Sequence, residues 1–297
     1  MAPLKQALTF EQQVEHLKIA HGLEIKNASE AIDILKRVNY YRLSAYGIGL
    51  KQNNNSEYYK SGVSLSDLYR LYQFDSHCRN QLMHIIEQIE IQFRTTLAYH
   101  IAIKYGPEGY MDSNNFKVKA KKDGTDIHTS ILESFRTECL RQQNLPFVKH
   151  HKAKYDGHFP IWVATELFTF GNLSSLYDIM LPDDQKTIAQ QYSTDAKYLR
   201  SWVLSLVEVR NICAHYTRLY NLPLKQTPFL YTEHVQYRNK KINKLFPIFL
   251  VIKRMTKNTP ELWEMFLEEF KKLMDEYADV VKLSFIGFPQ NWYEVLN

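Results

Sequence analysis

The stretch SDLYRLYQFDSHCRNQLMHIIEQIEIQFRTTLAYHIAIKY, residues 66–105, contains neither glycine nor proline. Its apolar residues recur every three or four positions and share one face of a helix: Leu82, Ile85, Ile86, Ile89, Phe93 and Leu97. A run of this length with one apolar stripe predicts a long helix that packs against other helices. Only 10 of the 297 residues are glycine, and helical periodicity recurs outside this stretch. The chain is therefore predicted to be all-α.

The rest of the chain divides into helical stretches and polar connections. We expect helices over residues 9–22, 29–47, 130–143, about 196–220 and 262–277, with further helices between 161 and 196. We treat residues 1–297 as a single α-helical domain with these parts: an N-terminal helical region over 1–60, a helical core over 66–222 that carries a loop insertion over 106–160, and a basic segment with the C-terminal helix over 223–297.

Composition excludes several classes of protein. Hydrophobic residues make up 45% of the chain and charged residues 23%, as in a soluble globular protein. The three cysteines, Cys78, Cys139 and Cys213, are widely spaced, which argues against a disulfide framework and against a zinc site. No run approaches the length of a membrane-spanning helix, and the first residues lack the apolar core of a signal peptide. We expect a cytoplasmic protein that does not enter the membrane.

Positive charge is concentrated in one segment. The net charge is +5, and residues 225–257 contain eight Lys or Arg residues but a single acid, Glu233. Aromatic residues alternate with these cations, as in surfaces that bind polyanions. A solvated basic loop would have the same composition, so both interpretations are open. If the segment binds RNA, the residues most closely spaced for it are Arg238, Lys240, Lys241 and Lys244.

A second unusual stretch is EVRNICAHYTRLYN, residues 208–221, at the end of the apolar helix predicted over 196–220. On a regular helix, one polar face would hold Glu208, Asn211, His215 and Arg218. Arg210 would lie on the apolar face instead. The cluster is either a helix end that becomes polar as it reaches the surface or an active site for cutting RNA.

The residue types suit RNA cleavage. RNA carries its own nucleophile, the 2′-OH, so the protein needs a proton shuttle and a group that stabilises charge on phosphate, and no metal or cofactor is required. A histidine with a pKa near about 6.5 suits the shuttle, an arginine suits the phosphate charge, and an asparagine can orient either. One histidine cannot be both acid and base, and Arg210 and His215 would point roughly 140° apart on a helix. A two-fold dimer or a local kink in the helix would solve this, and the sequence leaves both open.

The hexapeptide RNICAH, residues 210–215, resembles the R-x4-H motif of HEPN-superfamily ribonucleases. The wider chain resembles the abortive-infection (AbiD/AbiF-like) family of bacterial phage-defence proteins. The stretches that carry this resemblance are, in order, LTFEQQVEHLKIAHGL (8–23), NYYRLSAYG (39–47), IEIQFRTTLAYHIAIKYG (89–106), FPIWVATELFTFGNLSSLY (159–177) and GFPQNW (287–292).

The resemblance implies a HEPN-type helical bundle with an N-terminal helical extension and an irregular basic insertion. It also implies a homodimeric, metal-independent endoribonuclease that acts as a toxin, with an RNA antitoxin or a neighbouring regulator as a further partner. By position in the motif, the catalytic residues would be Arg210, Asn211 and His215. We interpret four further residues as supporting them: Glu90 and Arg94, which look like a polar pair of the family, and Glu208 and Arg218.

Some HEPN proteins bind RNA without cutting it, so the alternative is a non-catalytic RNA-binding or protein-interaction module of the same fold. Arg94 and His100 have five residues between them rather than four, so we do not count them as a second copy of the motif.

Overall fold

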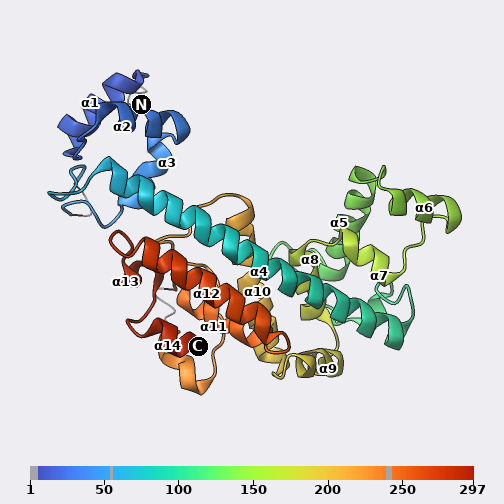
Figure 1. Ribbon diagram of the computed structural model, residues 1–297. Coiled ribbons are helices and arrows are strands. Elements are labelled where there is room, and N and C mark those ends of the chain that lie inside the picture. The colour runs from blue at the N-terminus through green and yellow to red at the C-terminus, as the bar shows by residue number, and fades with distance from the viewer. Residues whose placement is uncertain (1–5, 54–55, 239–242) are drawn as a thin grey trace.

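The computed structural model describes residues 6–53, 56–238 and 243–297 (Figure 1). These residues are largely helical, and their only extended pairings are isolated bridges. The predicted all-α class is therefore confirmed. Among the described residues, no helix combines the length and the apolar character that crossing a bilayer requires.

The α-helices are α1 (Phe10–His21), α2 (Ala28–Arg37), α3 (Tyr40–Ser44), α4 (Leu65–Tyr105), α5 (Ile127–Arg141), α6 (Pro146–Lys154), α7 (Ile161–Ala164), α8 (Phe170–Ile179), α9 (Pro182–Gln191), α10 (Ala196–Ala214), α11 (Phe246–Met255), α12 (Pro260–Glu276), α13 (Leu283–Ile286) and α14 (Trp292–Leu296). Short 3-10 turns, η1 (Ala45–Gly47) and η3 (Thr165–Leu167), continue α3 and α7.

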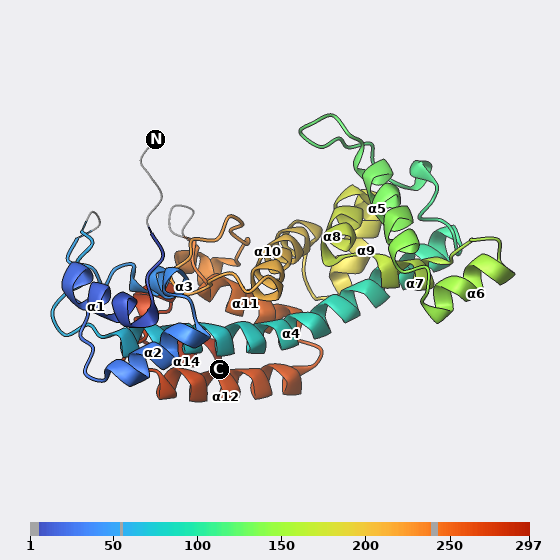
Figure 2. The same cartoon turned by 90° about the horizontal axis from the view of Figure 1, so that it is seen from above.

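The helix α4 is the axis of the molecule. It has 41 residues, which corresponds to a length of about 60 Å. Ser64 and Asp67 close its first turn with a capping box, and the chain leaves it at Gly106, whose φ of 86° favours glycine. The apolar stripe predicted from the sequence is buried along its length. Figure 2 shows α4 between α10 and α12, and both helices pack against it.

The N-terminal helices form a second, smaller hydrophobic cluster at one end of α4. Val14, Leu17 and Leu43 pack there with Leu65 and Leu68 from the first turn of α4. The prediction for the first helix is confirmed, because α1 ends at Gly22 in a left-handed conformation. The single helix predicted over 29–47 was wrong.

Two helices replace it because local capping interrupts the helical pattern. Val38 is extended, and the Asn39 side chain accepts a hydrogen bond of 2.7 Å from the backbone N–H of Tyr41. An asparagine that caps the next turn in this way competes with continuation of the helix before it. The same chemistry starts α2, which Asn27 caps one residue before Ala28.

The insertion over 106–160 lies at the opposite end of α4 from the N-terminal helices (Figure 1). The helix predicted over 130–143 is present as α5 and begins three residues earlier than predicted, at Ile127. A further helix, α6, was not predicted. Pro146 occupies its first turn, where proline is favoured, but only Val148 and His151 are buried in it. So few buried positions give no recognisable helical period.

Candidate active site

The end of α10 places the motif residues. The helix predicted to continue to residue 220 ends at Ala214, and this part of the prediction was wrong. The N–H of Tyr216 donates to the Cys213 carbonyl (3.1 Å) and that of Thr217 donates to the Ile212 carbonyl (3.0 Å). Tyr216 is left-handed, with a φ of 54°. This is a Schellman motif, with His215 as the capping residue.

The early end of the helix separates residues that were predicted to share one face. Asn211 lies exposed in the last turn of α10 and His215 lies exposed at its cap, where the backbone N–H of His215 donates to the Asn211 carbonyl at 3.0 Å. Arg218 lies beyond the Schellman motif and is no longer part of the helix. The polar face over 208–218 is therefore not continuous.

Arg210 reaches from α10 to α4. Its Nε lies 3.2 Å from Oε2 of Glu90, and its Nη1 donates to Oδ1 of Asn211 at 3.2 Å. Helical arithmetic had placed this arginine on the apolar face. The structure gives the reason, since that face is directed at α4 and Glu90 supplies a carboxylate there.

Glu90 bridges two arginines. Its Oε1 accepts a hydrogen bond of 3.1 Å from Nη2 of Arg94, and its Oε2 pairs with Arg210. The side chains of Glu90, Arg94 and Arg210 are 10%, 14% and 27% exposed. One carboxylate thus serves two guanidinium groups, which leaves a net positive charge beside the exposed Asn211. Arg94 and His100 are not joined, because His100 pairs with Asp184 instead.

Glu208 has a different role from the one predicted by its place on the polar face. Its two carboxylate oxygens accept hydrogen bonds of 2.7 Å each from the backbone N–H groups of Lys225 and Gln226. The side chain therefore fixes the chain after α10.

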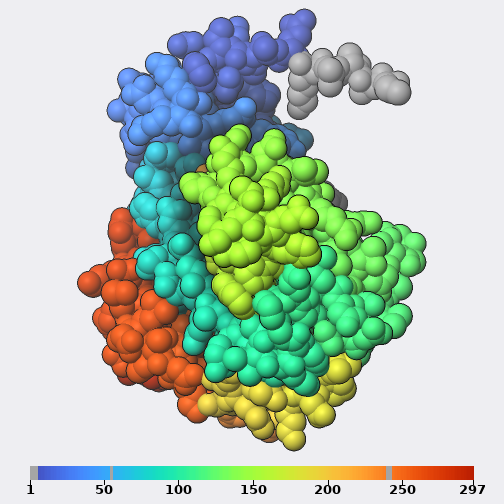
Figure 3. All heavy atoms as spheres, turned by 90° about the vertical axis from the view of Figure 1, so that its right-hand side faces the viewer, coloured from blue at the N-terminus to red at the C-terminus, as the bar shows by residue number. Residues whose placement is uncertain are grey.

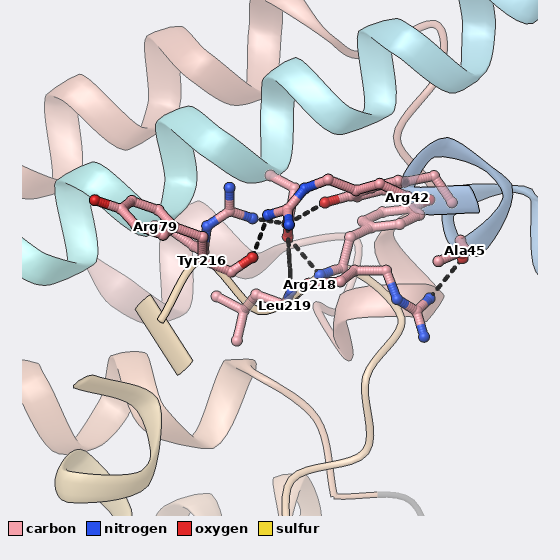
Figure 4. Close-up of polar contacts among 9 residues, drawn as sticks. Arg42, Ala45, Arg79, Tyr216, Arg218 and Leu219 are labelled. Carbon is pink, nitrogen blue, oxygen red and sulfur yellow. Dashed lines mark hydrogen bonds and ion pairs between the residues drawn. The ribbon is translucent and has the colours of Figure 1, made fainter. Parts of the chain in front are cut away.

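Arg218 holds the N-terminal helices to the segment after the motif (Figure 4). Its Nη1 donates to the carbonyl of Ala45 at 2.9 Å. Burial lowers the pKa of Arg218, while the charges of Tyr46 and Asp75 act in the opposite direction. Close by, Arg42 donates to the carbonyl of Tyr216 (Figure 4). The residue that follows His215 is thus tied to α3.

A buried carboxylate anchors the same segment from α4. Asp75 is 1% exposed and accepts hydrogen bonds from the backbone N–H groups of Leu219 (3.0 Å) and Tyr220 (2.6 Å). It also accepts one from the Tyr46 hydroxyl (2.7 Å) and pairs with Arg79. Burial raises the pKa of the Asp75 carboxyl, against the opposing effect of Arg79 and the three donors.

The role of Asp75 was not predicted from the sequence, although the sequence indicates that the residue is unusual. Asp75 and Arg79 are four residues apart and interrupt the apolar stripe of α4 on its buried side. Charged residues in such positions are normally paired. Their distant partners, the backbone groups at 219 and 220, carry no sequence signal.

The cations of the basic segment make different contacts. The Arg238 guanidinium lies 4.6 Å from the centre of the Phe229 ring, and its Nε donates to the Pro228 carbonyl. Lys244 donates to Oδ1 of Asn221 at 2.9 Å, and burial together with the charge of Arg218 lowers its pKa. Lys240 and Lys241 lie outside the described residues.

No group of three or more His, Cys, Asp or Glu residues in the described part of the chain is arranged to hold a metal ion. The three cysteines are buried and free.

Comparison with known proteins assigns the family. The model of the family described as Abi-like protein matches residues 33–221, which is more than half of the chain. The match includes the Arg42 and Asp75 anchors, the Glu90 bridge and the complete motif, and it ends before the basic segment. No curated protein and no solved structure matches the chain. On the strength of the family match, the chain belongs to the Abi-like protein family.

Proposed function

We propose that this Abi-like protein is an abortive-infection toxin of the HEPN type, which cuts RNA in the cytoplasm without a metal ion. The Glu90 bridge carries the proposal. It holds the arginine of the R-x4-H motif, which is hydrogen-bonded to the exposed Asn211, together with a second arginine, Arg94. The exposed His215 follows Arg210 by five positions and caps the same helix. Cleavage of a phosphodiester by its own 2′-OH requires cations that stabilise charge on the phosphate and a group that transfers protons, and the motif supplies both.

In the proposed reaction, the ribose 2′-oxygen attacks the neighbouring phosphorus while one neutral His215 takes the 2′-OH proton. The bond between phosphorus and the 5′-oxygen then breaks, and a protonated His215 gives its proton to that oxygen. The products are a 2′,3′-cyclic phosphate and a free 5′-hydroxyl. Arg210 and Arg94 stabilise the negative charge on the phosphate oxygens, and Asn211 orients Arg210, to which it is hydrogen-bonded.

The reaction uses two histidines, and one chain supplies a single His215 at the motif. We therefore place the site between two copies of the chain related by a two-fold axis, which brings both copies of the motif to one cleft. RNA is the substrate. Arg238, Lys240, Lys241 and Lys244 are proposed to hold it, and an RNA antitoxin or a neighbouring regulator would restrain the activity.

A second candidate function has an observation of its own. Arg210 joins α4 to α10 through a largely buried carboxylate, and a bridge of this kind also fits a purely structural arginine. The second candidate is therefore a non-catalytic module that binds RNA or protein. In that case His215 is an ordinary exposed residue at the end of a helix.

Cleavage and binding by one variant separate the two candidates. His215→Ala should abolish RNA cleavage and leave RNA binding and the unfolding midpoint unchanged, because the side chain is exposed and its loss should cost no more than about 0.5 kcal/mol. His84→Ala on α4 removes another exposed histidine and serves as the control. A wild-type protein that binds RNA without cutting it, or a folded His215→Ala protein that cuts at the full rate, would favour the non-catalytic module.

A further inference from the structure

Two adjoining hollows lead away from the Glu90 bridge along α4. The first, of about 400 Å³, begins at Arg94 and lies between α4 and the α7–η3 turn. The second, of about 420 Å³, lies between the end of α4 and the segment from α6 to α7. Trp162 lines both hollows, so they meet at its side chain, and we refer to the two together as the groove. Figure 3 shows this face, with the α6–α7 segment in yellow-green beside the end of α4 in blue-green.

Small residues form the floor of the first hollow. Ala98 and Ala102 are one turn apart on α4, and their short side chains leave space that longer ones would fill. Tyr99 stands at the edge and is 66% exposed. Arg94, one turn before Ala98, is the only cation that lines this hollow in the described chain, and Glu166 is the only acid.

Aromatic rings form the second hollow. Trp162 is 54% exposed and Tyr155 is 45% exposed, and both line it together with Pro107 and Pro160. The Tyr155 ring lies 5.3 Å from that of His151, which in turn stacks on Phe159. Partly exposed aromatic rings suit a flat ligand, which can stack on them.

The charge around the second hollow favours a polyanion. Lys154 stands over the Tyr155 ring at 5.2 Å, and residues 145–155 include three lysines and no acid. The one acid that lines the second hollow, Glu108, is paired with His158 at 2.9 Å. Rings that bind flat groups, with cations at both ends of the groove, match an unpaired nucleic-acid strand, whose bases stack while its phosphates contact the cations.

We propose that this groove, from Arg94 to Tyr155, binds the unpaired RNA strand that leads into the cleavage site. The inference rests on the proposed function, and it adds that the substrate is single-stranded on one side of the cut. Tyr105, the last residue of α4, follows Arg94 by eleven positions, which is about 16 Å along the helix axis. The groove is therefore long enough for more than one nucleotide.

The test measures binding of a labelled single strand that cannot be cut because every 2′-OH is methylated. Trp162→Ala and Tyr155→Ala should each weaken its binding about tenfold, since stacking of one base on an aromatic ring contributes roughly this much. Ala102→Trp should weaken binding as well, by filling the first hollow. Two exposed positions away from the groove, Tyr41→Ala and Leu140→Ala, are the controls and should bind like wild type. The same strand in a duplex should be insensitive to all five changes.

A second measurement needs no variant. A strand that carries 5-iodouridine should cross-link to Trp162 or Tyr155 of the wild-type protein under ultraviolet light, and mass spectrometry of the peptides locates the cross-link.

Wild-type affinity in the folded groove variants, or cross-links confined to other segments, would overturn the groove as a binding site. Loss of dimer mass in the same variants would also overturn it, because a second copy of the chain would then cover this face. The proposed function fails separately, if the wild-type protein binds the strand through the groove but cuts no RNA.

Discussion

Arg210 on α10 and Glu90 on α4 form an ion pair with 3.2 Å between Nε and Oε2, and the same carboxylate holds Arg94. Glu90→Gln keeps the shape of the side chain and removes its charge, which leaves two partly buried arginines without a counter-ion. We expect unfolding in urea to show a loss of about 1–3 kcal/mol, together with slower RNA cleavage as Arg210 loses its position. Glu87→Gln, at an exposed position one turn earlier, is the control and should change neither quantity. Unchanged stability in Glu90→Gln would mean that the bridge does not hold the two helices together.

A mixed dimer tests whether the two copies of His215 act in one cleft. A dimer of one wild-type chain and one His215→Ala chain, isolated with two different affinity tags, should lose at least about 100-fold in cleavage rate, because a missing proton-transfer group costs this much or more. Two independent sites would instead leave half of the wild-type rate. The control is a mixed dimer with one His84→Ala chain, which should cut normally.

The proposed chemistry predicts insensitivity to chelators. Cleavage should continue in EDTA and leave 2′,3′-cyclic phosphate ends, which mass spectrometry detects. A substrate with 2′-O-methyl at the scissile nucleotide should resist while the same change elsewhere has no effect, because only the attacking oxygen is blocked. Activity that is lost in EDTA and restored by Mg²⁺ or Mn²⁺ would contradict this mechanism.

The basic segment should contribute to RNA binding through its positive charge. Replacing Arg238, Lys240, Lys241 and Lys244 with Gln should weaken RNA binding and make it less dependent on salt. The slope of the logarithm of the binding constant against the logarithm of the salt concentration should become shallower by about 0.7 for each lost phosphate contact with a single strand. The control replaces exposed lysines elsewhere, namely Lys26, Lys36, Lys186 and Lys272. An unchanged slope would identify the segment as a solvated loop.

Asp184 should make stability depend on pH. Burial opposes its ionisation, but hydrogen bonds from Lys104, Tyr105 and His100 outweigh burial and lower its pKa. In the unfolded chain an aspartate has a pKa of about 3.9. Because the pKa of Asp184 is lower in the folded protein, its ionised carboxylate stabilises the fold at pH values above about 3.9. This stabilisation is lost as the pH falls through the pKa of Asp184 in the folded protein. Asp184→Asn should therefore destabilise the protein at pH 7 and much less at pH 3, as measured by urea unfolding. The exposed neighbour Asp183→Asn should show no such difference between the two pH values.

The helices that bury apolar stripes could be predicted from the sequence, and the ends of some could not. The buried positions of α4 run from Leu65 to Ile101, which is about ten turns, so their period dominates any local irregularity. The end of α10 depends on Tyr216, which adopts a left-handed backbone conformation that is most common for glycine. Arg42 and Asp75 hold this turn from distant parts of the chain, and contacts of that kind leave no local pattern.

Parts of the candidate site could also be predicted from the sequence, and other parts could not. The residue types and spacing from Arg210 to His215 follow from the sequence, and so does the pairing of Glu90 with Arg94, since they are four residues apart on one helix. The contact between Glu90 and Arg210 depends on how α4 and α10 are packed, which periodicity does not determine. For Glu208, helix geometry could not give its partners, the backbone N–H groups of Lys225 and Gln226.

The length of α4 also affects how the oligomeric state should be measured. A compact chain of 297 residues has a radius of gyration of about 19 Å, which corresponds to a sphere roughly 50 Å across. α4 alone is longer than that, at about 60 Å. An elongated particle diffuses more slowly than a sphere of the same mass, so a monomer of this chain would elute early from a gel-filtration column and imitate a dimer. Light scattering or sedimentation equilibrium, which report mass independently of shape, are the measurements that can count its subunits.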